Sequence, residues 1–121
     1  MDRAEFERLV VEALDGIPDE FARHLENVTV VIEDEPSAEQ LRSLGLDPRR
    51  DTLYGLYQGT PLPGRAYDYA GLPDRVSIFA GPLMRDYPTA PELGRQIRQT
   101  VMHEIAHFFG FEERRIRGLG F

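Results

Sequence analysis

The segment formed by residues 100–111 constrains the fold more than any other part of the chain. Apart from His103, Glu104 and His107, none of its residues is charged or titratable. A helix on a protein surface would instead alternate an apolar stripe with a charged face. The segment is therefore predicted to be a helix that is buried on nearly all sides. Burying two imidazoles and a carboxylate without partners would cost several kcal/mol, and a shared metal ion would remove that cost.

The spacing of the two histidines favours a metal site. His103 and His107 are four residues apart, so a helix places both imidazoles on one face, where they can reach one ion. Glu104 lies one residue further round, beside such an ion rather than on it. A carboxylate there can hydrogen-bond a metal-bound water and accept its proton, as in zinc-dependent hydrolases. The alternative is a solvated helical face with two histidines, and the apolar flanks argue against it.

Gly110 predicts a sharp end to this helix, because glycine adopts a positive φ without a steric clash. The returning chain would bring Glu112 or Glu113 towards the same ion as a third ligand, and a fourth position would stay open for water. The alternative is a surface helix on which these glutamates pair with the arginines that follow, which are Arg114, Arg115 and Arg117.

The chain resembles the small bacterial zincin-like metallopeptidases, which are single-domain proteins of about this length. The resemblance covers most of the chain and rests on several short motifs. These are Ile-Pro at 17–18, Leu-Tyr-Gly-Leu-Tyr-Gln-Gly at 53–59, Leu-Pro-Asp-Arg followed by Val-Ser-Ile-Phe at 72–79, Gly-Pro-Leu at 81–83, and residues 101–110 with the acidic residues after them.

The resemblance implies a metal site and an activity. The family pattern is H-E-x-x-H-x-x-G-x-x-D, and its third-ligand aspartate falls on Glu113, which is longer by one methylene. It implies one zinc ion held by His103, His107 and Glu113. It also implies that Glu104 is the general base in the hydrolysis of a peptide or protein substrate. A non-catalytic metal-binding or regulatory domain is the alternative, and a structural domain without metal is a third hypothesis. A site kept only for stability would have no use for Glu104.

The rest of the sequence predicts a small set of helices and strands. A helix capped by Asp2 spans residues 2–14, and a short helix capped by Ser37 spans residues 37–44. The site helix opens at Pro91. We predict strands at 28–32, 53–58 and 76–80, the first of them buried on both faces inside the sheet, with a loop or short hairpin at 59–73.

The resemblance implies how these elements assemble. The expected fold is α+β and zincin-like, formed by a single domain at 1–121 with a small mixed sheet and an N-terminal helix. By analogy, residues 76–80 lie inside the sheet and residues 53–58 form an antiparallel edge strand that packs on the site helix. An extended peptide could pair with that edge and lie across the metal. Tyr54 and Tyr57 are equally well explained as aromatic strand residues packed on the sheet.

Composition narrows the partners. A formal net charge of −7 argues against nucleic acid, whose phosphates attract basic surfaces. No stretch approaches the roughly 20 apolar residues of a membrane span. The sequence has no cysteine and its first residues lack the pattern of a secretion signal, so we expect a cytoplasmic monomer.

Some polar residues are left without a firm role by the sequence. His24 is predicted to be structural or exposed, and the acidic run at 33–35 to be a solvated turn after a strand. A second donor to the oxyanion of the reaction would come from one of five tyrosines, among which the sequence does not choose: Tyr54, Tyr57, Tyr67, Tyr69 and Tyr87.

Overall fold

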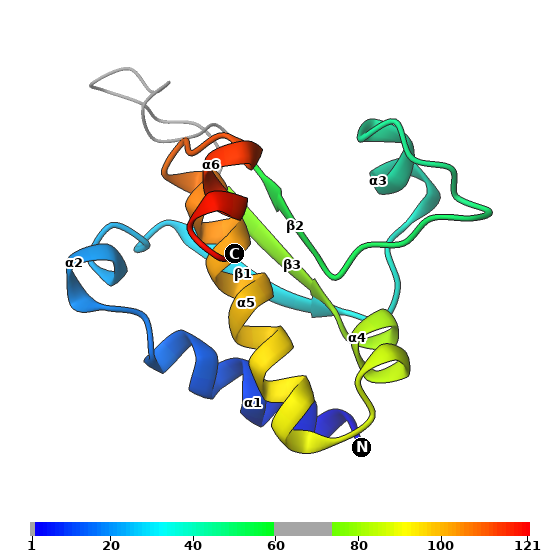
Figure 1. Cartoon of the computed structure of the whole chain (residues 1–121), viewed down its shortest axis with the longest axis horizontal. Coiled ribbons are helices and arrows are strands. Elements are labelled where there is room, and N and C mark those ends of the chain that lie inside the picture. Colours follow the sequence, from blue (N-terminus) through cyan, green and yellow to red (C-terminus); the bar gives the residue numbers. More distant parts are fainter. Residues whose placement is uncertain (1, 60–73) are drawn as a thin grey trace.

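The computed structural model describes residues 2–59 and 74–121 (Figure 1). The helices are α1 (Arg3–Asp15), α2 (Asp19–Ala22), α3 (Ala38–Ser43), α4 (Ala80–Asp86), α5 (Ala90–Phe108) and α6 (Glu113–Gly118), and the strands are β1 (Val28–Glu33), β2 (Gly55–Gln58) and β3 (Asp74–Phe79). Most of the predicted loop at 59–73 lies outside the described residues. No helix in the described ranges is long and apolar enough to cross a membrane.

The three strands form one mixed sheet in the order β1-β3-β2. β1 runs parallel to β3 with Val28 opposite Asp74, and β2 runs antiparallel to β3 with Gly55 opposite Ile78. The α+β class, the central position of β3 and the antiparallel edge position of β2 are thus confirmed. The edge strand is shorter than the predicted 53–58, since it begins at Gly55 and leaves residues 53 and 54 outside it.

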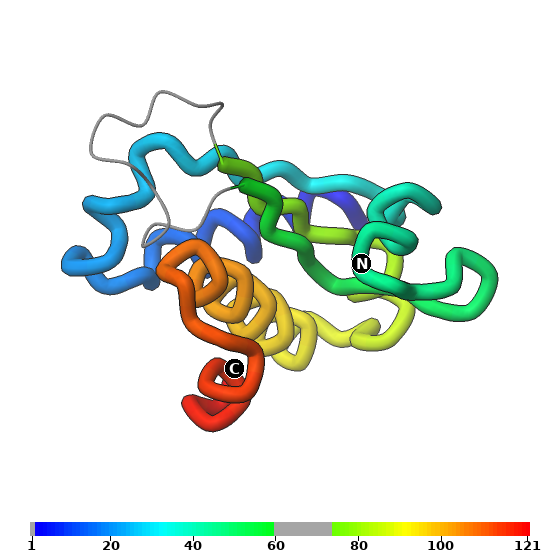
Figure 2. Tube along the Cα trace, turned by 90° about the horizontal axis from the view of Figure 1, so that it is seen from above, coloured from blue at the N-terminus to red at the C-terminus, as the bar shows by residue number. Residues whose placement is uncertain are grey.

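The main core lies between the sheet and two helices. Phe6 and Val10 of α1 pack with Ile97 and Val101 of α5 and with Ile78 of β3, and all five are at most 3% exposed. Residues at this spacing fall on one face of each helix. Viewed from above, α5 runs alongside the strands, with the C-terminal segment on its far side (Figure 2). Helix α5 therefore has the core on one face and the edge strand β2 beside it.

The position predicted for β1 is wrong. β1 lies at an edge of the sheet, and its residues are only partly buried, with Thr29 exposed. A run of β-branched apolar residues fits a central strand and a half-covered edge strand equally well. β3 occupies the centre instead, and its residues from Val76 to Phe79 are all buried.

The short helices α2 and α4 were not predicted. The predicted strand 76–80 ends one residue early, because Ala80 already begins α4, where Pro82 sits in the first turn. The predicted caps are confirmed: Asp2 accepts a hydrogen bond from the Glu5 N–H, and Ser37 forms a capping box with Gln40. Both residues fix where a helix begins.

Helix α5 forms where the sequence predicts it, but the part predicted to be buried on nearly all sides is fully buried on one face and only partly buried on the other. It starts at Ala90 with Pro91 in its first turn, and no residue between 100 and 109 is fully exposed. The strand β2 approaches it closely at Gly55. A Cβ atom at Gly55 would lie 2.6 Å from Cγ2 of Thr100 and 3.2 Å from Cγ of Glu104. The absence of a side chain at Gly55 therefore allows the close distance between the edge strand and the site helix.

We expect Gly55→Ala to lower the free energy of unfolding by about 1–3 kcal/mol, the usual cost of overpacking. Thr100 is β-branched and cannot easily swing away from the new methyl group. Urea denaturation measures the change. Gly16→Ala is the matched control, since its Cβ would meet its nearest atoms at an ordinary 3.5 Å, and it should not destabilise the protein. Equal stability of both variants would contradict the close approach.

Candidate metal centre

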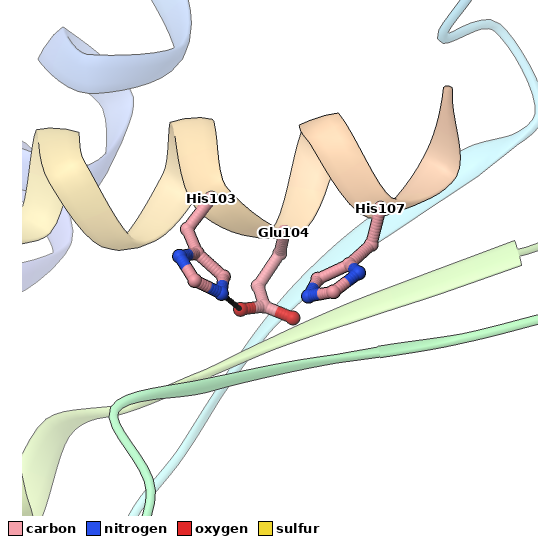
Figure 3. A group of neighbouring side chains, drawn as sticks. All are labelled: His103, Glu104 and His107. Atoms are coloured by element: carbon pink, nitrogen blue, oxygen red, sulfur yellow. Dashed lines mark ion pairs between the residues drawn. The ribbon is translucent and has the colours of Figure 1, made fainter. Parts of the chain in front are cut away.

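Three side chains on one face of α5 form the centre of the site (Figure 3). His103, Glu104 and His107 offer potential ligand atoms that all lie within 4.8 Å of one another. The two imidazole rings have their centroids 5.1 Å apart. The side chains are 21%, 9% and 31% exposed in that order, so the group lies partly buried with one open side. The i, i+4 spacing thus brings both imidazoles together as predicted.

The chain turns sharply after α5 and returns to the histidines. Gly110 has φ of +84°. Its N–H donates to the carbonyl of His107 at 2.9 Å, and the Phe111 N–H donates to the carbonyl of Ala106 at 3.0 Å. This pair of bonds is a Schellman motif, in which the left-handed residue is usually glycine. The turn predicted at Gly110 is therefore present, and it directs the following residues back over α5.

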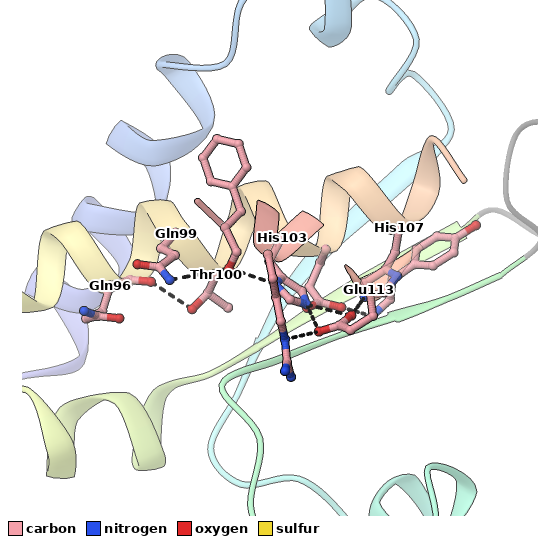
Figure 4. A network of polar contacts seen from close by, with 10 residues as sticks. Gln96, Gln99, Thr100, His103, His107 and Glu113 are labelled. Carbon is pink, nitrogen blue, oxygen red and sulfur yellow. Dashed lines mark hydrogen bonds and ion pairs between the residues drawn. The ribbon is translucent and has the colours of Figure 1, made fainter. Parts of the chain in front are cut away.

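The turn brings Glu113 to both histidines (Figure 4). Its carboxylate lies 3.0 Å from Nε2 of His103 and 2.9 Å from Nε2 of His107. The alternative pairing is also present in part, since Nε of Arg117 lies 3.5 Å from the same carboxylate. Glu112 is the exposed N-cap residue of α6. Of the two glutamates left open by the residue pattern, Glu113 faces the imidazoles.

Glu104 is held by the edge strand. Its Oε1 atom accepts a hydrogen bond from the backbone N–H of Tyr57 at 2.9 Å, and its Oε2 atom lies 4.0 Å from Nε2 of His103. Burial raises the pKa of the Glu104 carboxyl, while the two imidazoles and the Tyr57 N–H favour its ionised form. Glu113 contacts the imidazoles more closely than Glu104 does, which suits Glu113 as a ligand and leaves Glu104 beside the centre.

Phe121 is a contact of the site that the sequence did not reveal. Its main-chain oxygen lies 3.0 Å from Nδ1 of His103, and it accepts a longer hydrogen bond of 3.4 Å from Nε2 of Gln99. A backbone carbonyl carries no signal of its role in the sequence, because every residue has one. Of the arginines Arg114, Arg115 and Arg117, it is Arg117 that lies beside the centre, where its Nε atom is 3.5 Å from the Glu113 carboxylate.

Two cavities flank the histidines. One, of about 470 Å³, is lined by polar and aromatic side chains such as Gln99, Tyr54 and Tyr87. The other, of about 500 Å³, has an apolar wall of four leucines, which are Leu44, Leu46, Leu53 and Leu56. Five residues line both cavities, namely Leu53, Gly55, His103, Glu104 and Arg117. A ligand that filled both would therefore cross the centre beside the edge strand.

The tyrosines are not equally placed to act at the centre. The hydroxyl of Tyr54 donates to Asp86, which raises the pKa of Tyr54, and the hydroxyl of Tyr57 donates to Asp74 at 2.7 Å. Tyr87 lines the first cavity. Tyr67 and Tyr69 lie outside the described residues. Tyr54 and Tyr57 thus use their hydroxyl groups in contacts that support the fold.

Two other polar features take part in structure. His24 packs edge-on against the ring of Phe109, with the ring centroids 6.0 Å apart. Each acidic residue of the run at 33–35 pairs with an arginine, the pairs being Glu33–Arg75, Asp34–Arg3 and Glu35–Arg85. The run therefore connects β1 to α1, β3 and α4.

The chain belongs to the zincin-like metallopeptidase family, whose model matches residues 25–120. No curated protein was found to match it. The donors at the centre fit the metal that this family implies. Two imidazole nitrogens and one carboxylate are a donor set that zinc prefers, and here one carboxylate contacts both nitrogens. The site therefore could hold a divalent metal ion.

If Glu113 is the third ligand, Glu113→Ala should weaken zinc binding by more than about 100-fold, beyond the loss usual for an outer contact. Glu112→Ala is the matched control, because it removes an exposed carboxylate from the neighbouring position. Titration of chelator-treated protein with zinc measures both affinities. A larger loss from Glu112→Ala would assign the ligand to the other glutamate.

Proposed function

We propose that the protein is a zinc-dependent metallopeptidase whose ion is held by His103, His107 and Glu113. The observation that carries this proposal is the contact of one Glu113 carboxylate with both imidazoles at 3.0 and 2.9 Å, next to the buried Glu104. When bound, zinc would supply a Lewis acid that polarises the scissile carbonyl and lowers the pKa of a coordinated water towards about 7, compared with about 9 for water on aqueous Zn²⁺ and about 15.7 for bulk water.

Glu104 serves as the general base in this proposal. The Tyr57 N–H holds its Oε1 atom, so its Oε2 atom is left to face the imidazoles. That oxygen takes the proton of the attacking water and afterwards delivers it to the leaving amine. A carboxylate whose position is fixed by a strand loses little freedom during the reaction, which favours proton transfer.

The substrate is proposed to be an extended peptide that lies along β2. The Phe79 N–H donates to the carbonyl of Tyr54, so the backbone groups of Gly55 and Tyr57 point away from β3. The Tyr57 N–H is already donated to Glu104. The backbone of Gly55, which lines both cavities, is therefore the place where a peptide would pair with the edge.

The side chains around the cleft suggest how the peptide would be oriented. On one side of the centre its side chains would contact the four leucines of the second cavity, and on the other the polar wall of the first. Arg117 lines both cavities, and we propose its guanidinium as the donor that stabilises the carbonyl oxygen as negative charge develops there.

Glu104→Gln tests the enzymatic role. The substitution is nearly isosteric and keeps an oxygen that can accept the Tyr57 N–H, so the fold and the zinc content should not change. Hydrolysis should fall by about 10²–10⁴-fold, the usual contribution of a general base. The measurement is digestion of a peptide library by wild type and variant at matched zinc content, with the exposed Glu112→Gln as a control that keeps full activity.

Two outcomes would contradict the proposal. Equal cleavage by wild type and Glu104→Gln would indicate a contaminating protease. Absence of cleavage by both, with zinc bound, would favour a non-catalytic metal-binding domain, because such a domain has no activity to lose.

A further inference from the structure

We propose that the main-chain oxygen of Phe121 is a positioning group for His103, which it orients for metal binding. This inference rests on the proposed function in one respect, namely that His103 is a zinc ligand. It adds that α6 and the residues after it complete the metal centre from two sides, with Glu113 at the start of the helix and Phe121 beyond its end.

The contact is direct and specific to one ring nitrogen. Nδ1 of His103 lies 3.0 Å from the Phe121 carbonyl oxygen, while Nε2 of the same ring faces Glu113. A carbonyl can only accept, so this contact requires the proton on Nδ1. Nε2, which faces the Glu113 carboxylate, is then the nitrogen that a metal ion between the two groups would bind.

The position of the carbonyl is fixed by the end of α6. Gly120 has φ of +92°, its N–H donates to the carbonyl of Arg117 at 3.0 Å, and the Phe121 N–H donates to the carbonyl of Ile116 at 3.1 Å. This is again a Schellman motif, of the same pattern as the turn at Gly110. Ile116 is fully buried and anchors the helix. The main-chain oxygen of Phe121 is therefore positioned by the hydrogen bonds of this turn.

A second donor holds the same oxygen from α5. Gln99 lies one helical turn before His103, and its side-chain amide donates to the Phe121 carbonyl at 3.4 Å. The oxygen thus accepts from two side chains on one face of α5 (Figure 4). Such a contact couples the segment after α6 to the orientation of one imidazole.

Two pairs of variants separate the carbonyl from other effects. Shortening the 121-residue chain to end at Gly120 removes the main-chain oxygen and the ring of Phe121 and moves the terminal carboxylate to Gly120, whereas Phe121→Ala removes only the ring. Gly120→Ala disturbs the turn through its positive φ, whereas Gly118→Ala adds a methyl group at a helical position. At neither glycine would the new Cβ meet any atom within 4 Å, so the second pair differs only in backbone conformation.

Zinc affinity, measured by competition with a chromogenic chelator, is the first readout. The shortened chain and Gly120→Ala should bind zinc about 10–100-fold more weakly than wild type, the usual effect of losing an outer partner of a metal-bound histidine. Phe121→Ala and Gly118→Ala should keep the affinity of wild type. Circular dichroism confirms that each variant is folded, and either pair alone suffices if a variant of the other does not fold.

The second readout is the Nδ1–H proton of His103, observed by NMR in the zinc-loaded protein. In wild type this proton should exchange slowly with water, and in the shortened chain and Gly120→Ala it should exchange rapidly, with the ring protons of His107 as an internal reference. Unchanged affinity in both disruptive variants would overturn the inference. A loss of affinity with the His103 proton still protected would also overturn it, because Glu113 would then be the group displaced.

Failure of the proposed function gives a different result. If wild type itself does not bind zinc in the chelator competition, the metal centre is wrong and the inference about Phe121 is overturned with it. If wild type binds zinc but cleaves no peptide, the proposed peptidase function is wrong. The zinc affinities and the proton exchange of the variants then still decide whether Phe121 positions His103.

Discussion

The hydrogen bond between the Tyr57 N–H and Glu104 determines how the site is built. The side chain of Glu104 is only 9% exposed, so its carboxylate needs a hydrogen-bond donor, and the Tyr57 N–H of the edge strand β2 supplies one. Because no further strand of the described residues pairs with this edge, its outward N–H groups lie outside the ladder, and the N–H of Tyr57 is bonded to the side chain of Glu104. Gly55 lets the strand come close enough for this bond, since any side chain there would collide with Thr100. The hydrogen bond and the close contact at Gly55 together fix the distance between β2 and α5.

The remaining parts of the site come from the segment that follows α5. Two turns of the same Schellman pattern, at Gly110 and Gly120, direct the chain first across the histidines and then back to α5. The first turn delivers a carboxylate, Glu113, and the second delivers a backbone carbonyl, that of Phe121. The short helix α6 can supply both groups because one glycine turn precedes it and another follows its last residue.

The sequence predicted the features that depend on local spacing. The two imidazoles share a helical face because they are four residues apart, and Gly110 marks the helix end because only glycine adopts its φ without strain. The predicted location of β1 was wrong because a run of apolar β-branched residues does not indicate whether a strand has one neighbouring strand or two. The helix α4 was missed because the residues before it continue the strand pattern. The roles of the Tyr57 N–H and the Phe121 carbonyl could not be predicted, since every residue carries the same backbone groups and only the fold selects one.

The manner in which α6 is attached has a consequence for the kinetics of the site. Ile116 is the buried residue of this helix, so little apolar surface holds α6 to the rest of the molecule. Segments with few buried contacts open locally at much lower free energy than the whole domain unfolds. We therefore expect α6 to open as a subglobal unit while α1, α5 and the sheet stay folded. An ion held through Glu113 would then enter and leave at the rate of this opening, and binding of the ion would slow amide exchange in α6 more than in the core.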